Sequence, residues 1–152
     1  MFGLRGYTLD IALPRRGGGK GEDADIDPFM GRKEAERRRD FTMNAMAVSA
    51  DGLIIDPYGG AEDIRRGCIR CVGAPEKRFD EDALRMLRAF RFSSRLGFEI
   101  EPATLAAIGK KAPLAAGLAA ERVSAEVEKI LLTARPETLH TVISLGLIDK
   151  YL

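Results

Sequence analysis

The stretch RFDEDALRMLRAFRFSSRLG (Arg78–Gly97) decides the fold of the second half of the chain. Its apolar residues recur at spacings of three and four, which is the period of one face of an α-helix. Asp80 is a candidate N-cap and Gly97 a candidate stop signal, so we predict one helix between them. From Arg85 onward, arginines recur at every third position on the polar side. That side is either a solvated charged face or a surface that reads a ligand.

Further helical patterns follow this stretch. EPATLAAIGKKAP carries a proline in what would be its first helical turn, AAERVSAEVEKILLTA is amphipathic, and RPETLHTVISLGL predicts a short helix. Residues 76–152 are therefore predicted to form an all-helical domain.

The first 75 residues are richer in strand patterns. Short apolar or alternating runs bounded by turn residues predict strands at Gly6–Pro14, Ala45–Ser49, Leu53–Ile55 and CIRCV. The segment after Pro14 contains three consecutive glycines and many acids, and it predicts a loop of about twenty residues. The chain is accordingly expected to belong to the α+β class, with a boundary near residue 75.

The composition is that of a globular protein, with 45% hydrophobic and 31% charged residues. The net charge of only +1 conceals local arginine clusters such as Arg37–Arg39. Arginine suits forked contacts to phosphate, so these clusters favour a nucleotide or nucleic-acid site. No apolar run approaches the roughly 20 residues of a membrane span, and the first residues lack a signal-peptide core. With two cysteines, we predict a cytoplasmic location.

Three short motifs suggest chemistry but are better explained structurally. GGGKG lacks the spacing of a phosphate-binding loop and predicts flexibility. EDADID lies between glycines and a proline, without the rigid platform that metal ligands need. CIRC is a lone pair of cysteines without a second pair, so we interpret both as structural.

Three other motifs occur together and in order: RRDFTMNAM (Arg38–Met46), DPYGGAED (Asp56–Asp63) and EDALRMLRAFRF (Glu81–Phe92). With AERVSAEVEKIL, they resemble the motifs of the bacterial class II tRNA nucleotidyltransferases, the CCA-adding enzymes, and of the related bacterial poly(A) polymerases. The resemblance implies part of a nucleotidyltransferase head, or palm, with an antiparallel-rich sheet in residues 1–75. It implies a helical neck that reads the nucleotide base in residues 76–152.

In that family, an acid and an arginine of the EDxxR motif pair with the incoming base, and here they correspond to Asp82 and Arg85. A carboxylate accepts a hydrogen bond from an amino group, and a guanidinium donates one to a ring nitrogen. Cytosine and adenine both present an amine beside an acceptor nitrogen. Guanine and uracil present a carbonyl and a ring N–H there, so each would leave polar groups unpaired, at roughly 1–3 kcal/mol apiece.

The resemblance also places other residues near the nucleotide. It implies that Arg39, Asp40 and Asn44 lie near the sugar and the triphosphate. Arg88 and Arg91 could contact the triphosphate or the RNA backbone, and the alternative is a solvated helix face. The implied partners are CTP, ATP and the 3′ end of tRNA.

Family members hold two Mg²⁺ ions through an Asp-x-Asp pair that follows a GGxxRD segment, and neither motif precedes Asp10. Asp10 is a candidate third carboxylate, although it could equally be a solvent-facing strand acid. We expect a fragment with the base-selecting half and without the metal-binding half, which binds Mg²⁺ poorly and lacks nucleotidyl transfer activity alone. An exposed sheet edge could drive formation of a homodimer.

Two alternatives to a CCA-adding fragment remain open at this point. The base-reading pair is shared with poly(A) polymerases, so it does not separate CCA addition from A addition. A non-catalytic module that binds RNA or a nucleotide is the other reading.

Overall fold

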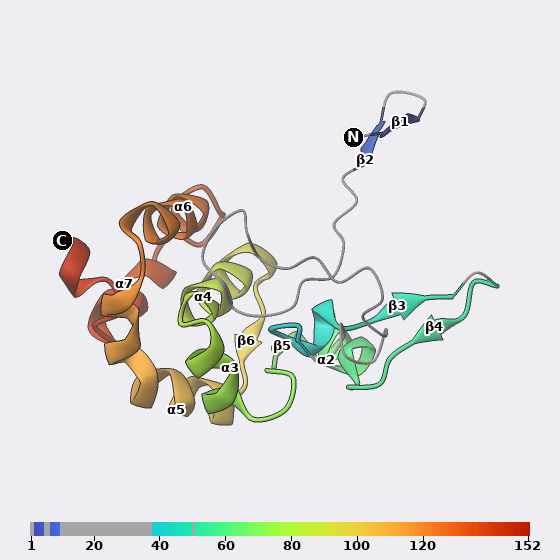
Figure 1. Cartoon of the computed structure of the whole chain (residues 1–152), viewed down its shortest axis with the longest axis horizontal. Helices are drawn as coiled ribbons and strands as arrows, with labels where there is room; N and C mark the ends of the chain where they lie inside the picture. Colours follow the sequence, from blue (N-terminus) through green and yellow to red (C-terminus); the bar gives the residue numbers. More distant parts are fainter. Residues whose placement is uncertain (1, 5–6, 10–37, 50) are drawn as a thin grey trace. The chain divides into compact units, whose positions relative to one another are not determined.

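The computed structural model describes residues 2–4, 7–9, 38–49 and 51–152, which divide into two compact units, residues 1–36 and 37–152 (Figure 1). In the first unit, β1 (Phe2–Leu4) pairs antiparallel with β2 (Tyr7–Leu9). β2 lies inside the strand predicted at Gly6–Pro14. Asp10, the glycine-rich segment and the acidic motif lie outside the described residues.

The strand-rich part of the second unit contains short elements. A 3₁₀ turn, η1 (Thr42–Asn44), precedes two strands, β3 (Ala47–Val48) and β4 (Ile54–Ile55), which pair antiparallel. The helix α2 (Gly60–Arg66) follows them. The strand β5 (Cys68–Ile69) pairs in parallel with a strand later in the chain, β6 (Glu99–Ile100). The strands predicted around the Asp51–Gly52 turn are confirmed, although each is only two residues long.

The rest of the unit is helical, as predicted, apart from the short strand β6. Its elements are α3 (Pro75–Glu81), α4 (Leu84–Leu96), α5 (Pro102–Lys111), η2 (Ala112–Gly117), α6 (Ala120–Leu131), α7 (Thr138–Ser144) and η3 (Asp149–Tyr151). The α+β class expected from the sequence is confirmed.

The predicted single helix from Asp80 to Gly97 is wrong at its beginning. α3 ends at Glu81, and α4 begins only at Leu84. Asp82 stands between them with extended backbone angles of φ −155° and ψ 104°. Its Oδ1 atom accepts a hydrogen bond of 3.1 Å from the N–H of Leu84, the first residue of α4, whereas Asp80, the predicted N-cap, lies inside α3.

The predicted stop at Gly97 is confirmed. Gly97 has a φ of 72°, in the left-handed region, and its N–H donates to the Ser93 carbonyl oxygen. Glycine adopts this conformation without a steric penalty, which explains why α4 ends there.

The core joins the strand-rich and helical parts of the second unit. Met86 and Leu87 of α4 are fully buried, and so are Phe79 of α3 and Phe41 beside η1. Apolar side chains from β5, α5, α6 and α7 complete the same cluster. The domain boundary near residue 75 stays a prediction.

Candidate functional site

The break between α3 and α4 presents the Asp82 carboxylate. Oδ1 is held by the Leu84 N–H, and Oδ2 accepts a hydrogen bond of 2.9 Å from Arg122 Nη2 of α6. About a third of the Asp82 side chain is exposed, at 32%. The Asp82 carboxylate is therefore partly exposed at the start of α4 and contacts α6 through Arg122.

Arg85 lies in the first turn of α4 and is anchored on three sides. Its Nη1 donates to Glu81 Oε2 at 2.7 Å and to the Arg78 carbonyl oxygen at 3.0 Å. Its Nη2 donates to the Arg38 carbonyl oxygen at 2.9 Å. Only 15% of the side chain is exposed. Asp82 and Arg85 thus lie close in the chain, but each is oriented by different partners and Asp82 is not part of the helix.

Asp40, Asn44 and Arg88 come together in the structure, a contact that the sequence did not predict for Arg88. The buried Asp40 carboxylate accepts hydrogen bonds from Asn44 Nδ2 at 3.0 Å, from Arg88 Nε at 2.7 Å and from the Phe41 N–H at 2.9 Å. Burial raises the pKa of Asp40, but the charge of Arg88 and the three donors together hold it below its ordinary value. Arg39, the neighbouring residue, is exposed.

Replacing Arg88 with methionine is expected to lower the free energy of unfolding near pH 7 by about 2 kcal/mol, because Asp40 would remain buried without its counter-ion. A third of the Arg88 side chain is exposed, at 33%, which limits the loss. Because the folded pKa of Asp40 is lowered, its contribution is present above the unfolded pKa of about 3.9 and is lost as the pH falls through the folded value.

Urea denaturation at neutral and acidic pH would measure this effect. The gap between the parent chain and Arg88→Met should narrow as the pH falls below about 4. Arg95→Met removes an exposed arginine from the same helix and serves as the control. If Arg88→Met and Arg95→Met lowered the free energy of unfolding equally at neutral pH, Arg88 would not be the counter-ion that stabilises the buried Asp40.

Arg91 is not part of a solvated face. Its Nε donates to Glu126 Oε2 of α6 at 2.6 Å, and its guanidinium lies 4.0 Å from the centre of the Phe92 ring. The residue is only 9% exposed. Arg91 therefore joins α4 to α6, and its predicted contact with triphosphate or RNA stays a prediction.

The DPYGGAED motif holds the RRDFT segment in place, a role that the sequence reasoning missed. Asp56 Oδ1 caps α2 by accepting from the Gly60 N–H at 2.7 Å. Gly60 itself packs on the backbone of Thr42. The buried Asp63 accepts from Thr42 Oγ1 at 2.5 Å and from Arg70 Nε at 3.0 Å. The two motifs occur together and in order in the sequence, and this joint occurrence was the signal from which their contact could have been predicted.

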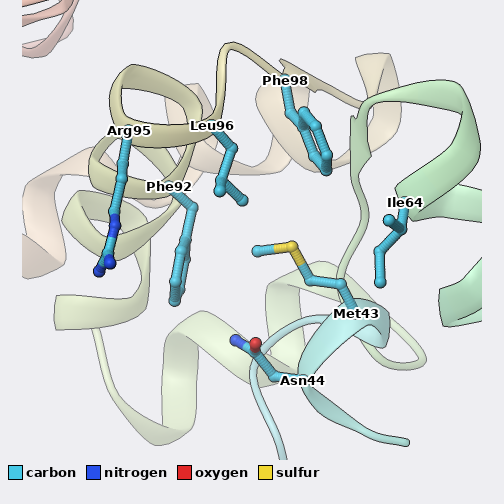
Figure 2. Close-up of a pocket in the computed structure, with 7 residues that line it drawn as sticks. All are labelled: Met43, Asn44, Ile64, Phe92, Arg95, Leu96 and Phe98. Carbon is cyan, nitrogen blue, oxygen red and sulfur yellow. The ribbon is translucent and has the colours of Figure 1, made fainter. Parts of the chain in front are cut away.

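A pocket of about 320 Å³ lies between η1, α2, the end of α4 and the segment before β6 (Figure 2). Figure 2 shows the Met43 side chain reaching from η1 into the space between Phe92 and Ile64. The lining residues are Met43, Asn44, Ile64, Phe92, Arg95, Leu96 and Phe98. Its walls are mostly apolar, with one amide and one guanidinium among them.

In the described ranges, no group of three or more histidine, cysteine or acidic side chains could hold a metal ion. Both cysteines are free, and Cys71 is buried, which raises the pKa of its thiol to about 12; Cys68 is half-buried. Within these ranges, every helix is too short or too polar to span a bilayer.

Two family models match consecutive parts of the chain. The poly A polymerase head domain matches residues 21–70. The segment described as the probable RNA- and SrmB-binding site of polymerase A matches residues 97–152. The EDALRMLRAFRF motif, Glu81–Phe92, lies between the two matches.

Curated relatives match at high identity. The CCA-adding enzyme of Geobacillus stearothermophilus is 58% identical over 99 residues, which is 65% of this chain and 24% of the relative. The CCA-adding enzyme of Bacillus subtilis is 48% identical over 119 residues, which is 78% of this chain and 30% of the relative.

Solved structures of similar proteins agree with the described fold. The Bacillus stearothermophilus CCA-adding enzyme in complex with CTP is 51% identical, with a TM-score of 0.74 over 77% of this chain and 30% of that one. The Thermotoga maritima CCA-adding enzyme complexed with tRNA is 32% identical, with a TM-score of 0.72 over 78% of this chain and 30% of that one. The chain spans about a quarter to three tenths of the length of these proteins.

Proposed function

Because the chain belongs to the RNA nucleotidyltransferase family of the CCA-adding enzymes and poly(A) polymerases, of which it spans a part, we propose that its described residues select the incoming nucleotide. The observation that carries the proposal is the break between α3 and α4. There Asp82 presents a carboxylate that is about one third exposed, and Arg85 presents a guanidinium anchored one turn away. A carboxylate and a guanidinium that reach the same base match the amine and acceptor nitrogen of cytosine or adenine.

We propose that the sugar and triphosphate are bound by the residues around Asp40. Asn44 and Arg88 hold the Asp40 carboxylate in its ionised state, and Arg39 is exposed beside it. Asn44 donates from its Nδ2 atom to Asp40, so its carbonyl oxygen can still accept a hydrogen bond from a hydroxyl. Arg91, which is buried against Glu126, would contribute mainly by fixing the position of α4.

The proposed substrates are CTP and ATP, and the proposed acceptor is the 3′ end of tRNA. Similar proteins have been solved with CTP, with ATP and with tRNA, which supports this choice. Relatives at 48% to 58% identity are CCA-adding enzymes, which favours CCA addition over poly(A) addition. We propose that transfer requires Mg²⁺, and no step of it is assigned to the described residues. A cytoplasmic location stays a prediction.

Nucleotide binding by the purified chain tests base selection. Titrations followed by the NMR signals of residues around Asp82 are expected to show weak binding of CTP and ATP. UTP and GTP should bind at least about tenfold more weakly, because each leaves polar groups unpaired. Arg85→Ala should abolish this preference, and Lys110→Ala, which removes an exposed cation of α5, should leave it intact. Equal affinities of the parent chain for the four nucleotides would refute the proposal.

We also propose a homodimer through the β3–β4 ribbon. Val48 and Ile54 are cross-strand partners and are 71% and 70% exposed, and Leu53 beside them is 64% exposed. Apolar side chains on a short ribbon favour pairing with a second copy. Sedimentation velocity should detect a dimer that the double variant Val48→Lys, Ile54→Lys removes. A clean monomer at the highest attainable concentration would exclude this interface.

A further inference from the structure

We propose that the pocket at the end of α4 receives one unpaired base of the acceptor RNA strand, and that Arg95 at its rim binds a phosphate of the same strand. The inference rests on the proposed function in taking RNA as the acceptor. Asn44 lines the pocket and also belongs to the proposed nucleotide site, but Asp82 and Arg85 do not line it. The pocket is therefore a separate place for a base.

The walls of the pocket suit a flat aromatic ring. Two phenylalanines, a methionine, a leucine and an isoleucine surround a volume of about 320 Å³, which is at the lower end of the range for ligand pockets. Such a volume has room for one base but not for a whole nucleoside triphosphate. Every base has a π-face that can stack on aromatic side chains, so the walls favour a base without selecting one.

The main aromatic wall is held in place by its own contacts. The Phe92 ring has the Arg91 guanidinium 4.0 Å from its centre, and its edge-to-face partner Phe41 lies at 5.8 Å. Figure 2 shows Met43 opposite Phe92 and the Phe98 ring pointing into the same space. A wall that is already ordered loses little conformational entropy when a ligand binds.

The pocket opens to solvent at its edge. Ile64 of α2 and Leu96 of α4 both line it, and they are 41% and 44% exposed. Exposed apolar side chains gathered around a cavity mark a binding surface. Single-stranded RNA provides a matching partner, because its bases can unstack and turn outwards onto aromatic side chains.

The polar groups of the pocket supply an acceptor and a cation. Asn44 donates from Nδ2 to Asp40, so its carbonyl oxygen, with two lone pairs, can accept from the amino group of a base. Arg95 is exposed and has neither a hydrogen bond nor an ion pair with any residue that the structure describes. The other arginines of α4 each bond a carboxylate, and they are Arg85, Arg88 and Arg91. The charge of Arg95 is therefore available to an anion.

A second guanidinium lies at the same end of α4. A Cβ atom at Gly97 would be 3.1 Å from Cζ of Arg135, so this guanidinium rests against the backbone just before Phe98. Arg135 is exposed, and its guanidinium has no hydrogen bond or ion pair within the described part of the chain. Two such cations beside an aromatic pocket match the alternation of phosphate and base along an RNA strand.

The position of the pocket favours the acceptor strand over other occupants. Asn44 contacts Asp40 at 3.0 Å, so the pocket adjoins the residues proposed to bind the sugar and triphosphate. Nucleotidyl transfer joins the acceptor to the incoming nucleotide, and the two must therefore lie side by side. A base near the end of the acceptor strand is then within reach of the pocket.

Fluorescence anisotropy with the purified chain tests the pocket. The probes are a short labelled strand of single-stranded cytidylate RNA and a spacer strand that has the same phosphates but no bases. The RNA should bind about tenfold more tightly than the spacer strand, the order expected for one stacked base. Phe98→Leu should remove most of this gain and leave the affinity for the spacer strand unchanged.

The phosphate contacts are tested by salt dependence. Arg95→Met and Arg135→Met should weaken both strands alike, and each should reduce the slope of log affinity against log salt by about 0.7, the value for one contact with a single strand. Lys110→Met removes a 71% exposed cation of α5 and should leave the slope and the gain unchanged. Thermal unfolding would verify that each variant is folded.

The methionine methyl groups give a direct readout by NMR. The Met43 signal should shift when RNA is added but not when the spacer strand is added. The signal of Met86, which is fully buried in the core, should move with neither. An absence of any Met43 shift with RNA would overturn the inference even if Phe98→Leu failed to fold. A poly-glutamate peptide that shifted Met43 as much as RNA does would overturn RNA as the occupant.

The outcomes separate this inference from the function on which it rests. If the two strands bind equally, or neither binds, while the preference for CTP and ATP is intact, the pocket is overturned and the proposed function stands. If the four nucleotides bind equally while the gain of RNA over the spacer strand is intact, nucleotide selection is overturned and the pocket stands. Complete displacement of the RNA by saturating CTP would place its base in the nucleotide site and overturn a separate pocket.

Discussion

Replacing Glu126 with alanine is expected to lower the free energy of unfolding by about 3–5 kcal/mol, the range for breaking a buried ion pair. The Glu126 side chain is 5% exposed and that of its partner Arg91 is 11% exposed. The alanine variant would leave the Arg91 guanidinium buried beside the Phe92 ring, without the carboxylate that it contacts at 2.6 Å. An uncompensated buried charge is far more costly than the lost attraction of the pair itself.

The same substitution should also affect the proposed base-reading site. The ion pair joins α4 to α6; α4 carries Arg85, and α6 carries Arg122, which contacts the Asp82 carboxylate. If α6 moves, Asp82 loses its orientation. We therefore expect Glu126→Ala to weaken CTP and ATP binding in the fraction of molecules that remain folded.

Chemical denaturation followed by circular dichroism would measure the loss of stability. The double variant Arg91→Met, Glu126→Leu removes both charges, and it should recover most of the lost free energy because an apolar pair can replace a buried ion pair. Lys129→Ala is the surface control: Lys129 also contacts Glu126, at 3.0 Å, but it is 55% exposed and should contribute no more than about 1 kcal/mol. A Glu126→Ala loss as small as that of Lys129→Ala would contradict the importance of the buried pair.

Replacing Gly60 with alanine is expected to destabilise the fold by about 2–3 kcal/mol, near the upper end of the usual range for overpacking. A Cβ atom at Gly60 would lie 2.3 Å from the Thr42 carbonyl oxygen and 2.7 Å from its carbonyl carbon. Both atoms belong to the backbone, so no side-chain rotation can relieve the contact. Either α2 or the segment that contains Asp40 would have to move.

A second glycine gives the matched control. Gly109 lies inside α5, and a Cβ atom there would meet nothing within 4 Å. Gly109→Ala should therefore stabilise the chain by up to about 1 kcal/mol through helix propensity alone. Urea denaturation of the two variants should show shifts of opposite sign. Shifts of the same sign and size would show that the close approach of α2 to Thr42 is not maintained in solution.

Much of the local structure could be predicted from the sequence. The period of the apolar residues in α4, the glycine stop at Gly97, the turn between β3 and β4, and the α+β class are consequences of interactions between near neighbours. The family resemblance, and not residue spacing alone, pointed to Asp82 and Arg85 as the proposed base-reading pair, and the hydrogen-bonding chemistry of a carboxylate and a guanidinium is consistent with that role. The start of α4 was missed because the apolar period continues from α3 into α4, and the pattern did not show that the backbone becomes extended at Asp82.

The sequence by itself therefore determined the family resemblance, the helical face and which two residues we propose to read the base. Only the tertiary structure decided what holds that pair. Arg85 bonds to the carbonyl of Arg38, 47 residues away, and Arg91 bonds to Glu126, 35 residues away. Contacts at such separations follow from how elements pack around a shared core, and a one-dimensional pattern contains no distance between them. For that reason the arginines that looked like one charged face proved to be three separately anchored groups.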